Sequence, residues 1–437
     1  MKTTQSDIAG MSNVQGLKWE RGLQAASAGK RKTGINRHAL QPCGRRSGLK
    51  PALRHSMLRA SIHFLTLAAG MALFLQFAGA PGVRAAEAAA NVAPLPFPLI
   101  ERFENFQVKD GMPTHKIHCV LRASDGNLWV GTYNGALVRE DGKFRRIGVE
   151  DGLSHKMVLC MVEDKRTGDM WIGTMRGLNR YSAGRITSYL QTTCGLPNNV
   201  IYGLGIVDDN LWVATAAGLG VLNLKTGEWT IYDQTNTTMH EPWVYSVAGA
   251  KDRVFVGVWG GGILEYDLAN KIFKEHRDPD RDFHFELVHD AGPVADITSW
   301  VAWEDGILWQ ATYFGMSRYD GSRWRTWQEK KSPLLSNFIN FIQPRGRVAW
   351  VGTDRGLSVT DGDTWANYRT NEKGEGIVEI TRPGQPVETR TMTTKLPNDF
   401  VLGIWADDKE AWFATSDGLG HAIFSIPPKP AKVADAQ

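Results

Sequence analysis

The chain has 437 residues, of which 42% are hydrophobic and 22% charged, and it contains 46 Gly and 16 Trp. Length alone predicts about two or three globular domains, although a repeat array of this length forms a single domain. The formal net charge is +4, but residues 1–56 carry 11 Lys or Arg against two acids, and residues 57–86 add two Arg. The rest of the chain then has a net charge of −7. This distribution excludes the basic footprint of a nucleic-acid-binding protein.

Two segments precede the main body of the sequence. Residues 1–56 lack apolar periodicity, so we interpret them as a disordered basic arm or as sequence upstream of a true start at Met57. Residues 57–86 have the parts of a signal peptide: Arg59, the apolar run Ile62–Ala80, and small residues where we expect cleavage. A retained membrane anchor is the alternative, but small and polar residues interrupt the run. We therefore predict a periplasmic or secreted protein, with residues 87–99 as a linker.

One phrase then recurs seven times, and it combines an aromatic residue, Gly or Ala, usually Thr, and a second Gly. It reads WVGTYNGA at Trp129, WIGTMRGL at Trp171, WVATAAGL at Trp212, FVGVWGGG at Phe255, WQATYFGM at Trp309, WVGTDRGL at Trp350 and WFATSDGL at Trp412. The successive spacings are 42, 41, 43, 54, 41 and 62 residues. Periods of about 40–45 residues with four strands each are typical of propeller blades. The sequence predicts an all-β, seven-bladed β-propeller over residues 100–426, followed by a disordered tail over residues 427–437.

Each unit divides into four short strands. In the second unit we expect strands at 157–163, 170–174, 178–181 and 186–189, and the large aromatic residue should fill the wedge between neighbouring blades. The last unit is one strand short at its carboxyl end, whereas residues 100–106 form a spare strand before the first unit. We expect this amino-terminal strand to complete the last blade and close the ring.

Two units contain insertions, His276–Gly292 and Asn371–Lys395. Insertions in repeat proteins commonly form loops on one face, often a functional one. The first contains alternating acids at Asp278, Asp280 and Asp282, but the Gly and the distal Glu of a calcium loop are missing, so we predict no metal site. We also expect Cys119 and Cys160 to point to opposite faces and to form no disulfide.

The recurring phrase, with preceding segments such as GLPNNVIYGL from Gly195, resembles the two-component regulator propeller repeat. The resemblance covers about residues 100–426. It implies an exported, ligand-sensing propeller, often fused to a membrane histidine kinase. Because the sequence has one set of seven repeats, no later apolar span and no kinase motif, we expect a stand-alone binding protein.

Strand direction alternates along a blade, so two sets of loops share one face, which we call the channel-mouth face. The returns from an outer strand to the next innermost strand supply ten candidate ligand-binding residues: His115, Lys116, His155, Lys156, Asn198, Asn199, Glu241, Asp296, Asn337 and Asp399. The turns between second and third strands supply Tyr133, Arg176, Trp259, Tyr313 and Arg355. Cations in the first units and carboxylates in later ones could orient a dipolar ligand. The competing interpretation is that Asn, Asp and His occupy these loops as ordinary turn residues.

These observations favour a non-enzymatic, exported propeller with a sensory, regulatory or scaffold role. We expect it to bind a small ligand (glycan or peptide) or a protein at the channel-mouth face, to need no cofactor or metal, and to meet a membrane only through a partner. The alternative is a metal-assisted lyase or hydrolase resembling virginiamycin B lyase, with His115, His155 and Glu241 as base, acid and metal ligand.

Overall fold

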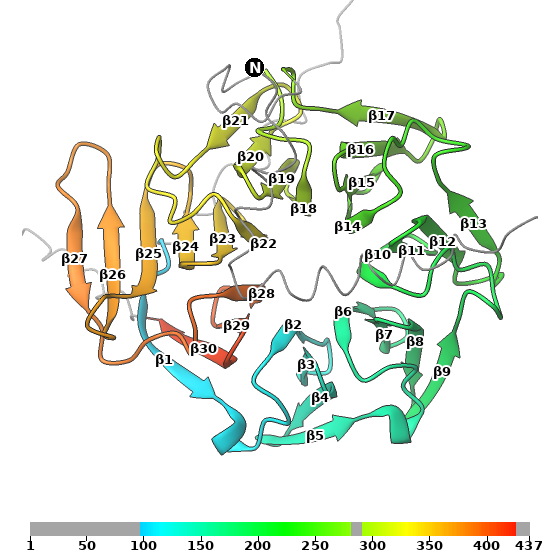
Figure 1. The fold of residues 1–437 in the computed structure, drawn as a ribbon, viewed down its shortest axis with the longest axis horizontal. Helices are drawn as coiled ribbons and strands as arrows, with labels where there is room; N and C mark the ends of the chain where they lie inside the picture. Colours follow the sequence, from blue (N-terminus) through cyan, green and yellow to red (C-terminus); the bar gives the residue numbers. More distant parts are fainter. Residues whose placement is uncertain (1–96, 281–290, 425–437) are drawn as a thin grey trace, which may run out of the picture. The chain divides into compact units, whose positions relative to one another are not determined.

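The structure is a computed structural model that describes residues 97–280 and 291–424. The predicted basic arm, signal peptide and tail, as well as Asp282, lie outside the described residues. In the described part, seven antiparallel sheets are arranged in a ring around a central axis (Figure 1), so the predicted all-β, seven-bladed propeller is confirmed. We number the blades from one to seven, beginning with the sheet that contains β2.

The innermost strands are β2 (Ile117–Arg122), β6 (Val158–Asp164), β10 (Ile201–Val207), β14 (Val244–Gly249), β18 (Thr298–Glu304), β22 (Ile339–Arg345) and β28 (Val401–Ala406). The second strands are β3 (Leu128–Thr132), β7 (Asp169–Thr174), β11 (Asn210–Thr215), β15 (Arg253–Val258), β19 (Ile307–Thr312), β23 (Val348–Thr353) and β29 (Ala411–Thr415). The third strands are β4 (Gly135–Glu140), β8 (Gly177–Ser182), β12 (Gly218–Asn223), β16 (Gly262–Asp267), β20 (Gly315–Tyr319), β24 (Gly356–Thr360) and β30 (Gly418–Phe424). The fourth strands are β5 (Lys143–Ile147), β9 (Arg185–Tyr189), β13 (Trp229–Tyr232), β17 (Ile272–His276), β21 (Trp324–Trp327), β25 (Trp365–Thr370) and β1 (Ile100–Phe106). Two short 3-10 helices, η3 (Val108–Asp110) and η4 (Val149–Asp151), lie in the returns to blades one and two.

The amino-terminal strand β1 closes the ring, as predicted. It pairs antiparallel with β30, with Phe103 opposite Ala422 and Phe106 opposite Leu419. Blade seven is thus built from both ends of the propeller sequence, and its outer edge is not left unpaired at β30.

Seven hydrophobic clusters fill the junctions between neighbouring blades. Each contains one aromatic residue of the repeated phrase, and all seven of these side chains are buried: Trp129, Trp171, Trp212, Phe255, Trp309, Trp350 and Trp412. The cluster around Trp171, for example, also contains Ile201 and Leu211 of the next blade. The repeated aromatic residue therefore fills the wedge between blades, where burial of a large ring stabilises the junction.

The repeated Thr and Gly have a structural reason in the turn between the second and third strands. In blade six, the buried Thr353 hydroxyl accepts a hydrogen bond from the Arg355 N–H at 3.1 Å and donates to the Gly356 carbonyl at 2.9 Å. The equivalent Gly135 of blade one has φ of 102°, and a Cβ there would lie 2.6 Å from the Ile147 carbonyl oxygen. Only glycine fits this turn without strain.

Blade four departs from the pattern, because Val258 replaces the threonine. The structure supplies the missing hydroxyl from the next blade: Thr298 Oγ1, at the start of β18, donates to the Gly262 carbonyl at 2.9 Å. The same turn atom is therefore satisfied by a residue 36 positions further along the chain.

Blade six has six strands, so the expectation that insertion 371–395 forms a loop on one face was wrong. Strands β26 (Gly376–Thr381) and β27 (Glu388–Thr391) extend the sheet outward beyond β25 (Figure 1, orange). Alternating apolar residues explain this, because Val378 and Ile380 of β26 join the core between blades six and seven. Ile377, on the other side of the strand, is also buried. The hairpin thus adds hydrophobic surface to a junction.

The first insertion is described only in part. Arg277 pairs with Asp296, with 2.7 Å between Nη2 and Oδ2, and Asp296 Oδ1 accepts from the Asp278 N–H at 2.8 Å. Within residues 97–280 and 291–424, no three His, Cys, Asp or Glu side chains gather as metal ligands. In the same described part, no helix has the length and apolar character needed to span a membrane.

The three cysteines of the described part are free thiols. Cys160 in blade two is buried and Cys119 in blade one is half-buried. They pair with the equivalent Gly173 and Gly131, so the expectation that they point to opposite faces was wrong. Burial raises the pKa of both thiols, to about 12 for Cys119. They are therefore protonated packing residues.

Candidate functional site

Backbone hydrogen bonds join the two loop sets of the channel-mouth face at six of the seven blade junctions. The N–H of the turn glycine in one blade donates to a return-loop carbonyl of the next blade. These bonds are Gly135 to Lys156 (2.6 Å), Gly177 to Asn199 (2.7 Å), Gly218 to Pro242 (2.7 Å), Gly262 to Asp296 (2.9 Å), Gly315 to Asn337 (3.0 Å) and Gly418 to His115 (2.8 Å). The loops that carry the predicted residues are thus held in a fixed arrangement around the channel mouth.

Each innermost strand contains an irregularity just inside this face. The pairing register shifts after the first residue of all seven strands, which leaves one bulged residue in each. The bulged positions are His118, Leu159, Tyr202, Tyr245, Ser299, Asn340 and Leu402. Because a bulge redirects a side chain, these residues are presented differently from an ordinary strand residue.

Six half-buried aromatic rings form a continuous series across blades three to seven, which we call the aromatic arc. Its members are Tyr202, Tyr245, Trp259, Tyr313, Phe338 and Phe400. Successive ring centroids lie 4.5, 5.1, 5.1, 3.8 and 6.4 Å apart. Stacked and edge-on pairs at such distances hold each other in position. The arc therefore presents a preformed apolar surface.

Blades one and two present cations instead of this arc. Lys116 Nζ lies 5.1 Å from the centroid of the Tyr133 ring, which stacks on His118 at 4.6 Å. Lys156 and Arg176 are exposed, and no ion pair links either side chain to another described residue. Burial lowers the pKa of His155, and the positive charges of Lys156 and Arg176 act in the same direction. This part of the mouth is thus electropositive.

Several predicted residues use their side chains within their own loops. Asn198 accepts from the Val200 N–H, Asn199 from Gln191, Asn337 from Glu329, and His155 Nδ1 from Met157. Asp399 accepts two hydrogen bonds from Thr370. These contacts are what the turn-residue interpretation predicts, so they give no support to a ligand role for these acceptor atoms.

The charged candidates divide into paired and unpaired groups. His115 Nδ1 lies 2.6 Å from Asp417 Oδ1, and Arg355 donates to Glu329 at 2.7 Å. Asp296 is neutralised by Arg277. Glu241 is exposed, beside the glycine turn of blade four.

Sequence reasoning missed four members of the aromatic arc: Tyr202, Tyr245, Phe338 and Phe400. Tyr202 and Tyr245 occupy bulged positions inside strands, where simple alternation places them in the sheet. Phe338 and Phe400 each lie one residue after a predicted site residue. Each of these four aromatic residues is adjacent to the first residue of an innermost strand. This recurrence in the sequence could have identified them.

A cavity of about 360 Å³ lies deeper, on the wall formed by the innermost strands of blades four to six. Trp300 and Phe341 line it, with ring centroids 4.3 Å apart, together with Trp303 and Glu304. None of the sequence-predicted residues lines this cavity.

Comparison with known proteins agrees with this architecture. Residues 111–134 match the family model described as "Two component regulator propeller". The chain carries the two-component regulator propeller repeat. The matched segment includes the return loop, β2, β3 and the turn of blade one, so it contains Lys116, His118 and Tyr133 of the channel mouth.

Solved structures of extracellular domains from two component systems show the same fold. The extracellular domain of BT4673 from B. thetaiotaomicron, assigned to a hybrid two component system, is 18% identical with a TM-score of 0.58, over 74% of this chain and 40% of that one. The corresponding domain of BT3049 from the same organism is 17% identical with a TM-score of 0.55, over 75% and 42%. This propeller thus spans less than half the length of either sensor domain. At such identities the likeness establishes the fold.

An enzyme also shares the fold. Virginiamycin B lyase from Staphylococcus aureus is 15% identical with a TM-score of 0.51, over 74% of this chain and 99% of that one. The lyase alternative requires His115, His155 and Glu241 to act together. In the structure His115 pairs with Asp417 and His155 with its own loop. Among curated proteins, none matches this repeat-containing chain.

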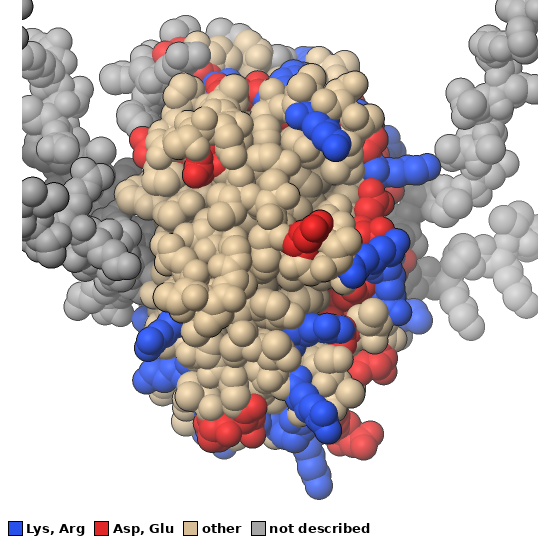
Figure 2. All heavy atoms as spheres, turned by 90° about the vertical axis from the view of Figure 1, so that its right-hand side faces the viewer, with Lys and Arg blue, Asp and Glu red and all other residues tan. Residues whose placement is uncertain are grey.

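The opposite face of the propeller uses its charges between blades. Arg122 of blade one pairs with Glu410 of blade seven, Arg166 of blade two with Asp209 of blade three, and Arg345 of blade six with Asp408 of blade seven at 3.0 Å. Figure 2, viewed onto the rim around β13, shows charged side chains gathered toward one side and a broad uncharged area beside them. Ion pairs between charged side chains on the opposite face therefore contribute to holding neighbouring blades together.

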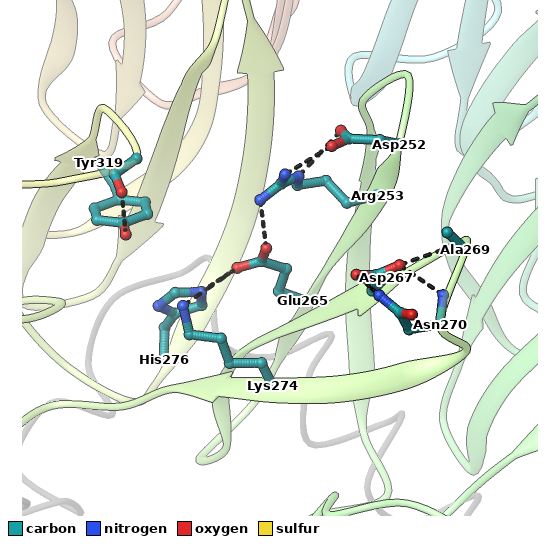
Figure 3. Close-up of polar contacts among 10 residues, drawn as sticks. Asp252, Arg253, Glu265, Asp267, Ala269, Asn270, Lys274, His276 and Tyr319 are labelled. Carbon is teal, nitrogen blue, oxygen red and sulfur yellow. Dashed lines mark hydrogen bonds and ion pairs between the residues drawn. The ribbon is translucent and has the colours of Figure 1, made fainter.

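A buried polar cluster lies away from the channel, in the outer half of blade four (Figure 3). His276 Nε2 lies 2.6 Å from Glu265 Oε2, and Glu265 Oε1 accepts from Arg253 at 2.7 Å. The His276 ring contacts Tyr319 and Trp324 of blade five, with centroids 5.4 and 5.6 Å away. The cluster is paired internally and bridges two blades.

Proposed function

We propose that this chain is an exported sensory or regulatory propeller that binds its ligand across the channel-mouth face. The aromatic arc carries this proposal. Six partly exposed rings from five blades converge on one rim, and no core requirement explains why rings from separate blades meet there. Loops on a rigid scaffold are where binding residues concentrate.

The distribution of charge supports the same face. On the channel-mouth face, Lys156 and Arg176 are exposed without an ion pair among the described residues. Such groups can engage a ligand without first breaking an ion pair, although they lose water on binding.

Export is supported by the signal-peptide features of residues 57–86. The similar propellers named above are extracellular domains of two component systems, which favours a sensory role for this one. We propose a periplasmic or secreted location, and either a small ligand or a protein segment as the molecule bound.

Thermal melting against a broad panel of sugars, amino acids, peptides and aromatic acids tests the proposal. A ligand at 100 times its dissociation constant stabilises the protein by about 2.7 kcal/mol. The decisive variant is Tyr313→Leu, which removes one ring of the arc. Tyr319→Leu is the matched control, because Tyr313 lies in the turn before β20 at the mouth, whereas Tyr319 ends β20 away from the mouth.

We expect the ligand-induced shift to be lost in Tyr313→Leu and kept in Tyr319→Leu, each compared with its own unliganded protein. A shift that survives Tyr313→Leu would place the site elsewhere and overturn the proposal.

A further inference from the structure

Cations and carboxylates are distributed unevenly around the channel mouth. Among the sequence-predicted carboxylates of this face, Asp296 is held by Arg277 and Asp399 by Thr370. Glu329 and Asp417, which also lie there, are held by Arg355 and His115. Glu241 of blade four is exposed, and Asp354 in the turn of blade six has a buried Oδ1 without a hydrogen-bond partner among the described residues.

The cations of blades one and two are not balanced in this way. Lys156 and Arg176 are exposed without an ion pair among the described residues, and Lys116 rests on the Tyr133 ring. Together they provide a local excess of positive charge. The part of the mouth formed by blades one and two thus favours the anionic group of a ligand.

These cations adjoin both ends of the aromatic arc. At the junction of blades two and three, the turn that carries Arg176 bonds through Gly177 to Asn199, three residues before Tyr202. At the junction of blades seven and one, the Ser416 N–H donates to the Phe400 carbonyl, and the same turn bonds through Gly418 to His115. Aromatic surface and positive charge therefore meet on one continuous rim.

We propose that the channel mouth binds an anion that carries a flat apolar ring, an aromatic carboxylate, with its ring on the arc and its carboxylate on Lys156 and Arg176. This inference rests on the proposed function and specifies the class of ligand. Arg and Lys form charge-assisted hydrogen bonds with carboxylates, and Tyr and Trp rings stack on flat rings. The two interactions require different parts of one ligand, so each can be removed separately.

Isothermal titration calorimetry at low salt with four probes tests both parts. The probes are 2-naphthoate, the neutral 2-naphthamide, the non-planar cyclohexanecarboxylate, and glucuronate as an acidic sugar. We expect 2-naphthoate to bind and each of the other three to bind at least about tenfold more weakly, since each lacks one of the two interactions. Added salt should weaken 2-naphthoate binding.

Two variants and one control test where the carboxylate of the ligand binds. Lys156→Gln and Arg176→Gln should each weaken 2-naphthoate binding by about tenfold, because a charge-assisted hydrogen bond is lost. Lys165→Gln is the matched control, because it removes one exposed positive charge from the β6–β7 turn of blade two, on the opposite face. It should leave the affinity unchanged. All three positions are exposed on turns, so the variants should fold.

The outcomes separate this inference from the proposed function. If 2-naphthamide binds as tightly as 2-naphthoate, the requirement for a negative charge is wrong. If glucuronate or cyclohexanecarboxylate binds as tightly as 2-naphthoate, the requirement for a flat ring is wrong. Affinity that is unaffected by Lys156→Gln and Arg176→Gln would overturn the location. If none of the carboxylates binds, while another ligand gives a melting shift that depends on Tyr313, the inference is wrong and the proposed function stands.

Discussion

The hydroxyl oxygen of Tyr368 accepts a hydrogen bond from the backbone N–H of Ile100 at 2.8 Å, across 268 residues of sequence. Both residues are buried. Tyr368 belongs to β25 of blade six, and Ile100 begins β1, the strand that closes blade seven. Thr394, which follows the blade-six hairpin, accepts a second hydrogen bond from Phe103 of β1 at 2.6 Å. Blade six with its insertion therefore secures the closing strand.

Tyr368→Phe should destabilise the propeller, because it leaves the Ile100 N–H buried without its acceptor. The expected loss in the free energy of unfolding is about 1–3 kcal/mol. Urea denaturation followed by tryptophan fluorescence measures it. Tyr319→Phe is the control, since the Tyr319 hydroxyl donates at an exposed site, to Gly321. Equal losses in the two variants would contradict a special role for the contact with β1.

Thr353→Val tests the reason for the repeated threonine. Valine has nearly the same shape but neither accepts from the Arg355 N–H nor donates to Gly356, so we expect a loss of about 1–3 kcal/mol in the free energy of unfolding. Thr298→Val should cost a similar amount, because Thr298 serves the blade-four turn that lacks its own threonine. A neutral Thr298→Val would show that the turn needs no hydroxyl.

The sequence was sufficient to predict the propeller because its signals repeat. Seven wedge-filling aromatic residues and seven turn glycines recur in phase. A misplaced strand boundary in one repeat therefore does not change the predicted number or order of the blades. The closing strand β1 followed from counting strands. The six-stranded blade did not follow, because the insertion's alternating Val378 and Ile380 were not considered against the core at the junction of blades six and seven.

The sequence predicted which loops share a face, but not which of their side chains are already paired. Loop alignment correctly identified which loops share a face, and it found Trp259 and Tyr313. It missed Tyr202 and Tyr245, because a β-bulge shifts the alternation that sequence reasoning assumes. It also counted Asn198, Asn337 and Asp399 as ligand groups, whereas their side chains accept hydrogen bonds in the fold. Sequence shows which polar residues are present, and only the structure shows which are already paired.

His118 should make the protein sensitive to mild acid. Burial, and then the charge of Lys116, lower its pKa to about 3, from an ordinary value of 6.5. Below pH 6.5 the His118 imidazole binds a proton in the unfolded chain but not in the folded protein. The free energy of unfolding therefore decreases as the pH falls from about 6.5 toward 3. At pH 5 the loss from this one residue should be about 2 kcal/mol.

His118→Gln should therefore lose less stability than the wild-type protein between pH 7 and pH 5, as measured by urea denaturation at each pH. His240→Gln, which removes an exposed histidine, should keep the steeper wild-type loss because His118 is still present. Identical pH profiles for His118→Gln and the wild-type protein would show that the pKa of His118 is not lowered in the folded protein.

Glu265 should contribute stability that disappears at low pH. The hydrogen bond from His276 lowers the pKa of Glu265 below its ordinary value of 4.5. Burial opposes this, and the charges of His276, Lys274 and Arg253 lower the pKa further. A lowered pKa in the folded state means that the stabilisation is fully present above about pH 4.5. It is lost as the pH falls through the folded-state pKa.

The comparison is between the wild-type protein and Glu265→Gln, by urea denaturation at pH 7, 5, 4 and 3. The variant should be less stable at pH 7, because Arg253 and His276 lose their shared carboxylate (Figure 3), and the difference should shrink below pH 4.5. The contribution of His118 is common to both proteins and cancels. Glu275→Gln, on the neighbouring strand β17 and 3.7 Å from exposed His240, is the control for loss of one negative charge. A difference that stays constant down to pH 3 would mean that the Glu265 carboxylate does not stabilise the contact between blades four and five.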